Sequence, residues 1–179
     1  DIMFKKIIIF FCLILLNFSC SKKEVVYEPS KKNDAYKLYE EGLVAFEKND
    51  YFFASKKFSE AELSFEIPKF AAKSAIMSSY SLYGINFYDE AEENLMRYFS
   101  TYPADENLIY AHYLLAIVYY EQISDEKKDI SPLLKANKQI DFFLKKYPDT
   151  DYATDLKFKK DLIQNQLAAK ELYVSKYYI

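Results

Sequence analysis

Residues 51–61 read YFFASKKFSEA, and three of them predict the fold. Ala54, Phe58 and Ala61 lie at positions i, i+4 and i+7, which share one face of a helix. The small side chains at both ends of this stripe leave room for a second helix to come close. The same spacing recurs twice further along the chain, in Ala91, Leu95 and Tyr98 and in Ala136, Ile140 and Phe143. A stripe that returns in this way predicts a chain of repeated helical units.

The composition excludes several classes of protein. Of the 179 residues, 51% are hydrophobic, so the chain can form a buried core and general disorder is excluded. Only 2 glycines and 5 prolines are present, which is too few for the frequent turns of a β-rich fold. We therefore predict an all-α protein.

Turn-forming residues divide the chain into pairs of helices. They lie at Asn49-Asp50, Pro68, Ile85-Asn86, Tyr102-Pro103 and Tyr147-Pro148. We predict hairpin repeats at about 34–68, 69–103 and 107–148, and a long helix at 152–179 that starts a fourth. The third hairpin carries about eight extra residues around 124–130.

Stacked hairpins of this kind predict a right-handed α-solenoid of tetratricopeptide-like units over residues 34–179. The alternative is a plain helical bundle. The sequence stops at Tyr177-Tyr178-Ile179 without a polar capping helix, so we expect it to be a truncated piece of a longer protein, or to need a partner at that end.

The N-terminus has the features of a targeting segment. Lys5-Lys6 precede a short apolar run from Ile7, which at about 1.5 Å per residue is too short to span a bilayer as a helix. Ser19-Cys20 resembles the end of a bacterial lipoprotein signal, in which the cysteine thiol is acylated. We predict a signal peptide at 1–19, a lipid on Cys20 and a flexible tether over 20–33. The alternatives are an uncleaved anchor or a different cleavage site.

No constellation of catalytic or ligand-binding residues is evident in the sequence. The net charge of −3 argues against nucleic acid as a partner, and no cysteine follows Cys20. The single histidine, His112, lies among apolar residues and is interpreted as a packing residue. Carboxylates such as Glu60 and Glu62 are interpreted as solvated surface. We therefore expect no enzymatic activity and no cofactor other than the lipid on Cys20.

The remaining candidate is a peptide groove on the first helices of the hairpins. Tyrosine suits such a surface because it offers a large contact area and a hydroxyl group. The candidate groove residues are Tyr36, Tyr39, Phe46, Tyr80, Tyr83, Tyr110, Tyr113 and Tyr120. The alternative is that these rings only pack neighbouring repeats together.

The pattern of Gly42, Ala54, Phe58 and Ala61 resembles the tetratricopeptide repeat. With Cys20, residues 38–42 and 98–103, the long third hairpin, and residues 147–155 leading into a long helix, the chain resembles the BamD family of outer-membrane assembly lipoproteins.

This resemblance implies a non-enzymatic scaffold, lipid-anchored at the periplasmic face of the outer membrane. Its implied partners are the periplasmic domains of BamA, other lipoproteins of the β-barrel assembly (BAM) complex, and unfolded outer-membrane proteins. The alternative is another periplasmic tetratricopeptide lipoprotein that scaffolds envelope or peptidoglycan machinery.

Overall fold

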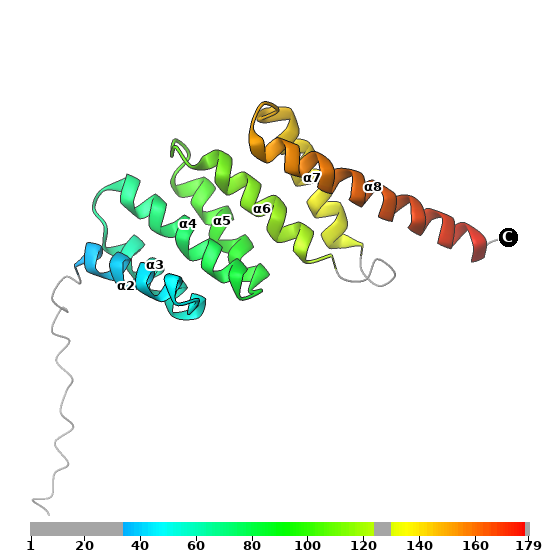
Figure 1. Ribbon diagram of the computed structural model, residues 1–179. Helices are drawn as coiled ribbons and strands as arrows, with labels where there is room; N and C mark the ends of the chain where they lie inside the picture. Colours follow the sequence, from blue (N-terminus) through cyan, green and yellow to red (C-terminus); the bar gives the residue numbers. More distant parts are fainter. Residues whose placement is uncertain (1–33, 124–129, 178–179) are drawn as a thin grey trace, which may run out of the picture. The chain divides into compact units, whose positions relative to one another are not determined.

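The computed structural model describes residues 34–123 and 130–177, and all regular structure in these ranges is helical (Figure 1). The helices are α2 (Ala35–Glu47), α3 (Tyr51–Ser64), α4 (Pro68–Gly84), α5 (Tyr88–Thr101), α6 (Leu108–Glu121), α7 (Ser131–Lys146) and α8 (Asp151–Tyr177). The all-α prediction is confirmed. The predicted signal peptide at 1–19, Cys20, the tether to residue 33 and most of the extra segment of the third hairpin lie outside the described residues, as do Tyr178 and Ile179.

The helices form successive hairpins. α2 packs on α3, α4 on α5 and α6 on α7, while α3 and α5 each pack on the first helix of the next hairpin. The first helices also meet directly, because α4 contacts α6 and α6 contacts α8. This arrangement brings the first helices of successive hairpins side by side on one surface.

The turns of the first two hairpins have the same construction. Asn49 and Asn86 each adopt a positive φ, of 60° and 62°, a left-handed conformation that asparagine tolerates better than most residues. In each turn the next tyrosine donates its hydroxyl to the asparagine side chain, Tyr51 at 3.0 Å and Tyr88 at 2.8 Å. Local side-chain bonds therefore close both hairpins in the same way.

The repeated stripes form the contacts between paired helices, as predicted. All nine of their side chains are fully buried: Ala54, Phe58, Ala61, Ala91, Leu95, Tyr98, Ala136, Ile140 and Phe143. Gly42 on α2 faces the ring of Phe58. A Cβ added at Gly42 would lie 2.7 Å from Cε1 of that ring, so only glycine fits without a shift of the ring or the helix.

Glu62 is not solvated surface, and that interpretation was wrong. Its side chain is only 4% exposed and accepts a 2.7 Å hydrogen bond from Nη2 of Arg97 on α5. The Tyr102 hydroxyl donates a further bond at 2.9 Å. Burial, followed by the bond to Glu62, raises the pKa of Tyr102 to about 12. The buried carboxylate therefore joins the first hairpin to the second.

His112 lies on α6 and packs against α5 and α7. Its ring stacks on Phe99 with centroids 4.1 Å apart and also contacts Phe142, and its Nδ1 atom is buried without a hydrogen-bond partner. Burial, together with the positive charge of Lys146, lowers the pKa of His112 from 6.5 to about 4. The neutral ring is therefore the form that the folded protein favours.

Gly42→Ala is expected to destabilise the domain by about 1–2 kcal/mol, because the overpacking cost of about 1–3 kcal/mol exceeds the gain of up to about 1 kcal/mol in helix propensity. Urea denaturation measures this change. Gly84→Ala is the matched control, since the nearest ring atom there lies 3.1 Å away and Gly84 is exposed. Phe58→Leu should cost less in the Gly42→Ala background than alone, and additive effects would contradict the contact.

Acid should weaken the fold through His112. Because its pKa is lower in the folded than in the unfolded state, its contribution is constant above about pH 6.5, falls as the pH drops toward about 4, and is level below that. The loss should be about 2 kcal/mol, less than the full shift would give because the ring keeps some exposure. Urea midpoints of the wild type and His112→Phe across this range test it. Equal losses in both proteins would assign the acid sensitivity to other groups.

Candidate functional site

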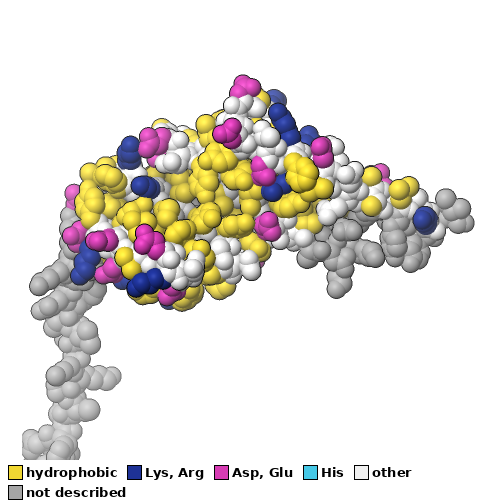
Figure 2. All heavy atoms as spheres, in the orientation of Figure 1, with side chains coloured by type: hydrophobic (Ala, Val, Ile, Leu, Met, Phe, Trp, Pro, Cys, Tyr) yellow, Lys and Arg dark blue, Asp and Glu magenta, His cyan; other side chains and the backbone are white. Residues whose placement is uncertain are grey.

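The eight predicted groove residues lie on the first helices: three on α2, two on α4 and three on α6. We call these residues, Tyr36, Tyr39, Phe46, Tyr80, Tyr83, Tyr110, Tyr113 and Tyr120, the tyrosine face. Tyr36 is 58% exposed, and the other seven are partly buried. Figure 2 shows hydrophobic side chains, a class that includes tyrosine and is drawn in yellow, gathered over α2, α4 and the start of α6. The rings both pack together and reach the surface.

The N-terminal part of the tyrosine face surrounds a small cavity. Tyr36 meets Phe65 edge-on with centroids 5.1 Å apart and Phe70 at 5.6 Å. These three rings, Tyr39 and Lys73 line a cavity of about 150 Å³. The Nζ atom of Lys73 lies 5.7 Å from the centroid of the Tyr39 ring, within reach of a cation–π interaction. The cavity is therefore an aromatic box with one cation at its edge.

The middle of the tyrosine face connects the first two hairpins. Phe46 on α2 contacts Tyr80 on α4 with centroids 5.6 Å apart, and Tyr80 contacts Tyr83 at 5.9 Å. Tyr83 in turn meets Tyr88, which opens α5, at 6.1 Å. This row of rings crosses from one hairpin to the next.

The third part of the tyrosine face joins α6 to α8. Tyr113 stacks on Tyr152 with centroids 4.6 Å apart and donates its hydroxyl to Asp155 at 3.0 Å. Tyr110 lies beside both rings, at 6.3 Å from Tyr113 and 6.0 Å from Tyr152. Tyr120 lies further along α6, with the Nζ atom of Lys159 5.1 Å from its centroid. The first turns of α8 therefore continue the face.

Burial raises the pKa of several of these hydroxyls, so they stay protonated over a wider pH range than an exposed tyrosine does. It raises the pKa of Tyr110 and of Tyr83, and it raises that of Tyr113 to about 12 with help from the Asp155 carboxylate. The hydroxyl of Tyr80 on α4 adds to the rise in the pKa of Tyr110 on α6. At neutral pH these groups can donate hydrogen bonds.

Most of the hydroxyls of the tyrosine face have no hydrogen-bond partner among the residues that the structure describes. Among the described residues, Tyr113 is bonded to Asp155, whereas the hydroxyls of the other six tyrosines of the face make no hydrogen bond. A hydroxyl at the surface can bond to the backbone of a bound peptide as well as to water.

Sequence reasoning missed three aromatic residues that complete the face. Phe65 lies between α3 and α4, while Phe70 and Tyr152 lie in the first turns of α4 and α8. None of them occupies a position in the repeated stripe. Tyr152 could have been found, because like Tyr110 it lies in the first turn of a helix that follows a Tyr-Pro turn.

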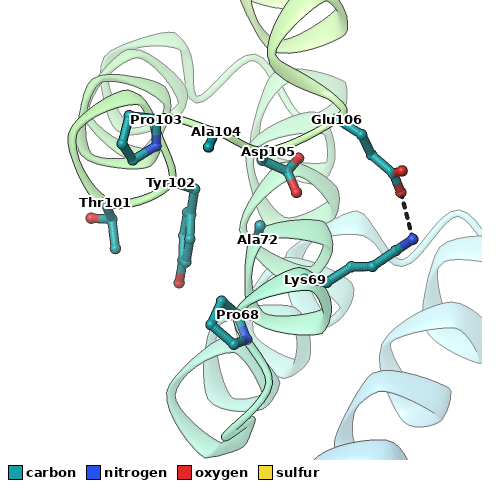
Figure 3. A pocket seen from close by; sticks show the side chains of 9 residues that line it. All are labelled: Pro68, Lys69, Ala72, Thr101, Tyr102, Pro103, Ala104, Asp105 and Glu106. Carbon is teal, nitrogen blue, oxygen red and sulfur yellow. Dashed lines mark ion pairs between the residues drawn. The ribbon is translucent and has the colours of Figure 1, made fainter.

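A second cavity, of about 410 Å³, lies between the start of α4 and the turn from α5 to α6 (Figure 3). Pro68, Ala72, Tyr102 and Pro103 give it apolar walls. An ion pair of 3.0 Å between Lys69 and Glu106 borders one side, as the dashed line shows. The cavity contains Tyr102-Pro103, one of the stretches that carries the sequence resemblance.

The described residues contain no group of three His, Cys, Asp or Glu side chains that could hold a metal ion. In the same part of the chain, no helix combines the length and apolar character needed to cross a membrane.

Comparisons with known proteins identify the family. Residues 31–179 match the model of the YfiO family, described as "Outer membrane lipoprotein". The "Outer membrane protein assembly factor BamD" of Caulobacter vibrioides is 32% identical over 158 residues, covering 88% of this chain and 51% of the relative. The BamD protein of Rickettsia prowazekii is 31% identical over 142 residues, covering 79% and 57%. The chain thus spans about half the length of these relatives. It belongs to the YfiO/BamD family of outer-membrane lipoproteins.

Proposed function

We propose that this chain is a non-enzymatic lipoprotein scaffold that takes part in the assembly of β-barrel proteins in the outer membrane. Membership of the family and the names of the relatives, outer-membrane protein assembly factors, support this role. In this proposal Cys20 carries the lipid that holds the protein at the periplasmic face of the outer membrane. The partners are BamA periplasmic domains, other BAM lipoproteins and unfolded outer-membrane proteins.

The tyrosine face is proposed as the binding site for unfolded outer-membrane protein segments. The observation that carries this proposal is the set of part-exposed rings on the first helices α2, α4 and α6, of which Phe46 and Tyr80 meet directly between α2 and α4. Extended segments from β-barrels alternate apolar and polar side chains and carry unpaired backbone groups. Aromatic rings bind the apolar side chains, and the unbonded hydroxyls bind the backbone.

The aromatic box suits the end of such a segment. Its volume of about 150 Å³ is on the scale of one large side chain, and its walls are the rings of Tyr36, Tyr39, Phe65 and Phe70. Lys73 at the edge can meet a terminal carboxylate. A strand that ends in an aromatic residue presents both groups together.

Loss of the central rings should weaken peptide binding. We expect Tyr80→Ala/Tyr83→Ala to raise the Kd for a β-barrel C-terminal strand peptide ending in phenylalanine by about 10- to 30-fold, since buried aromatic contacts dominate such interfaces. Fluorescence anisotropy with the labelled peptide measures this. Tyr80→Phe/Tyr83→Phe separates the rings from the hydroxyls and should cause a smaller loss.

The matched control for this experiment is Phe53→Ala/Leu63→Ala, which removes two exposed apolar side chains from α3. This variant should bind the peptide as the wild type does. An equal loss of peptide affinity in both double alanine variants would mean that binding is nonspecific. The tyrosine face would then not be the peptide-binding site.

Association with BamA is tested separately, by co-purification of the full chain with BamA periplasmic domains. We expect the two to co-purify. The Tyr80→Ala/Tyr83→Ala variant should retain this contact, because our proposal assigns the tyrosine face to unfolded segments and not to BamA. If the chain does not retain BamA but retains another envelope protein, the result would favour the alternative, a lipoprotein that scaffolds envelope or peptidoglycan machinery.

A further inference from the structure

A groove between α3 and α5 has walls on two helices that carry none of the tyrosine face. Its lining runs from Phe52 to Glu60 on α3 and from Glu90 to Ser100 on α5. Ser78 and Leu82 of α4 form its floor. The cavity has a volume of about 900 Å³. We refer to it as the α3–α5 groove.

Short polar side chains keep the floor of this groove open. The hydroxyls of Ser59 and Ser78 lie 2.9 Å apart, and Ser78 donates to the carbonyl of Ser55 at 3.1 Å. The side-chain amide of Asn94 donates to the Ser78 hydroxyl at 3.2 Å. Because these groups are already bonded to one another, covering them with a ligand has little desolvation cost.

Exposed apolar side chains border the groove. Phe52 is 50% exposed on the α3 wall, and Met96 is 53% exposed on the α5 wall. Phe87, also exposed, meets Phe52 edge-on with centroids 6.5 Å apart. Apolar side chains that border a concave surface are typical of protein interaction sites.

Some charged side chains of the groove form ion pairs and others do not. The buried carboxylate of Glu62 neutralises Arg97, and Lys57 pairs with Glu60 at 3.4 Å. By contrast, Glu90 and Glu93 on the α5 wall form no ion pair within residues 34–123 and 130–177. They are three residues apart, so both project from the same side of the helix.

The one lysine in the lining does not offset this charge by an ion pair. Lys56 on the opposite wall lies over the ring of Phe52, with its Nζ atom 4.5 Å from the centroid. Arg97 also lines the groove and attracts Glu93 at longer range, but its direct ion pair is with the buried Glu62. Glu90 and Glu93 are therefore carboxylates without a direct ion pair among the described residues, and they lie next to exposed apolar side chains.

We infer that the α3–α5 groove binds a short basic amphipathic segment of a partner protein. Lysine or arginine side chains of that segment meet Glu90 and Glu93, and an apolar side chain of it lies against Phe52 and Met96. The α3 lining covers about 12 Å at about 1.5 Å per residue, which matches two turns of helix or about four extended residues. This site is separate from the tyrosine face and does not depend on the function proposed for it.

The test uses the full chain and a helical peptide of about twelve residues, with leucines on one face and lysines on the other. Fluorescence anisotropy should show binding, whereas an acidic twin with glutamate in place of each lysine should not bind. Glu90→Lys/Glu93→Lys should raise the Kd of the basic peptide about tenfold or more and allow the acidic twin to bind. Met96→Ser should weaken binding of the basic peptide.

Glu40→Lys/Glu47→Lys is the matched control, because it makes the same change in net charge at two exposed positions of α2. It should change the Kd of the basic peptide by less than about twofold. Circular dichroism checks that both charge variants keep their helical content.

Three results would overturn the inference. They are no binding of the basic peptide at about 1 mM, an equal loss of affinity in the two charge variants, or NMR amide chemical-shift changes, on adding the basic peptide, that are confined to the tyrosine face. Self-association of the chain that Met96→Ser abolishes would also overturn it, because the groove would then hold a second copy.

Discussion

Close packing of α2 on α3 at Gly42 is the contact on which the tyrosine face depends. The hydrogen of this glycine allows the Phe58 ring to be fully buried between the two helices. Phe58 in turn supports Tyr39, whose ring lies 5.3 Å from it, and Tyr39 forms a wall of the aromatic box. The position of the proposed binding surface is thus set by a residue that is itself buried.

The periodic parts of the fold could be predicted from the sequence, and the irregular parts could not. Ala54, Phe58 and Ala61 repeat in register, so their burial follows from helical geometry alone. Glu62 has no such signal, because Arg97 is 35 residues away and only the stacking of two hairpins brings them together. From the sequence alone, a carboxylate beside a repeated stripe is therefore interpreted as solvent-exposed, because its partner is not known.

The candidate site was predicted in part for the same reason. Repeat positions on the first helices located the tyrosines, but Phe65 and Phe70 contribute through a linker and a helix start. Some of the rings pack between hairpins and are partly exposed as well, since Tyr113 packs against α8 while keeping some exposure. Packing between hairpins and an accessible aromatic surface are therefore properties of the same residues.

The joint between Glu62 and Arg97 has a consequence for how the protein responds to ionic strength. Because the carboxylate is 4% exposed while the guanidinium is 43% exposed, salt screens this pair less than it screens a fully exposed pair. The spacing of α3 and α5 that the pair helps to fix therefore depends only weakly on salt. Glu90 and Glu93 on the surface of the same groove have no such protection, and counterions screen them at ordinary concentrations. The groove therefore combines a shape that depends weakly on salt with surface charges that salt screens strongly.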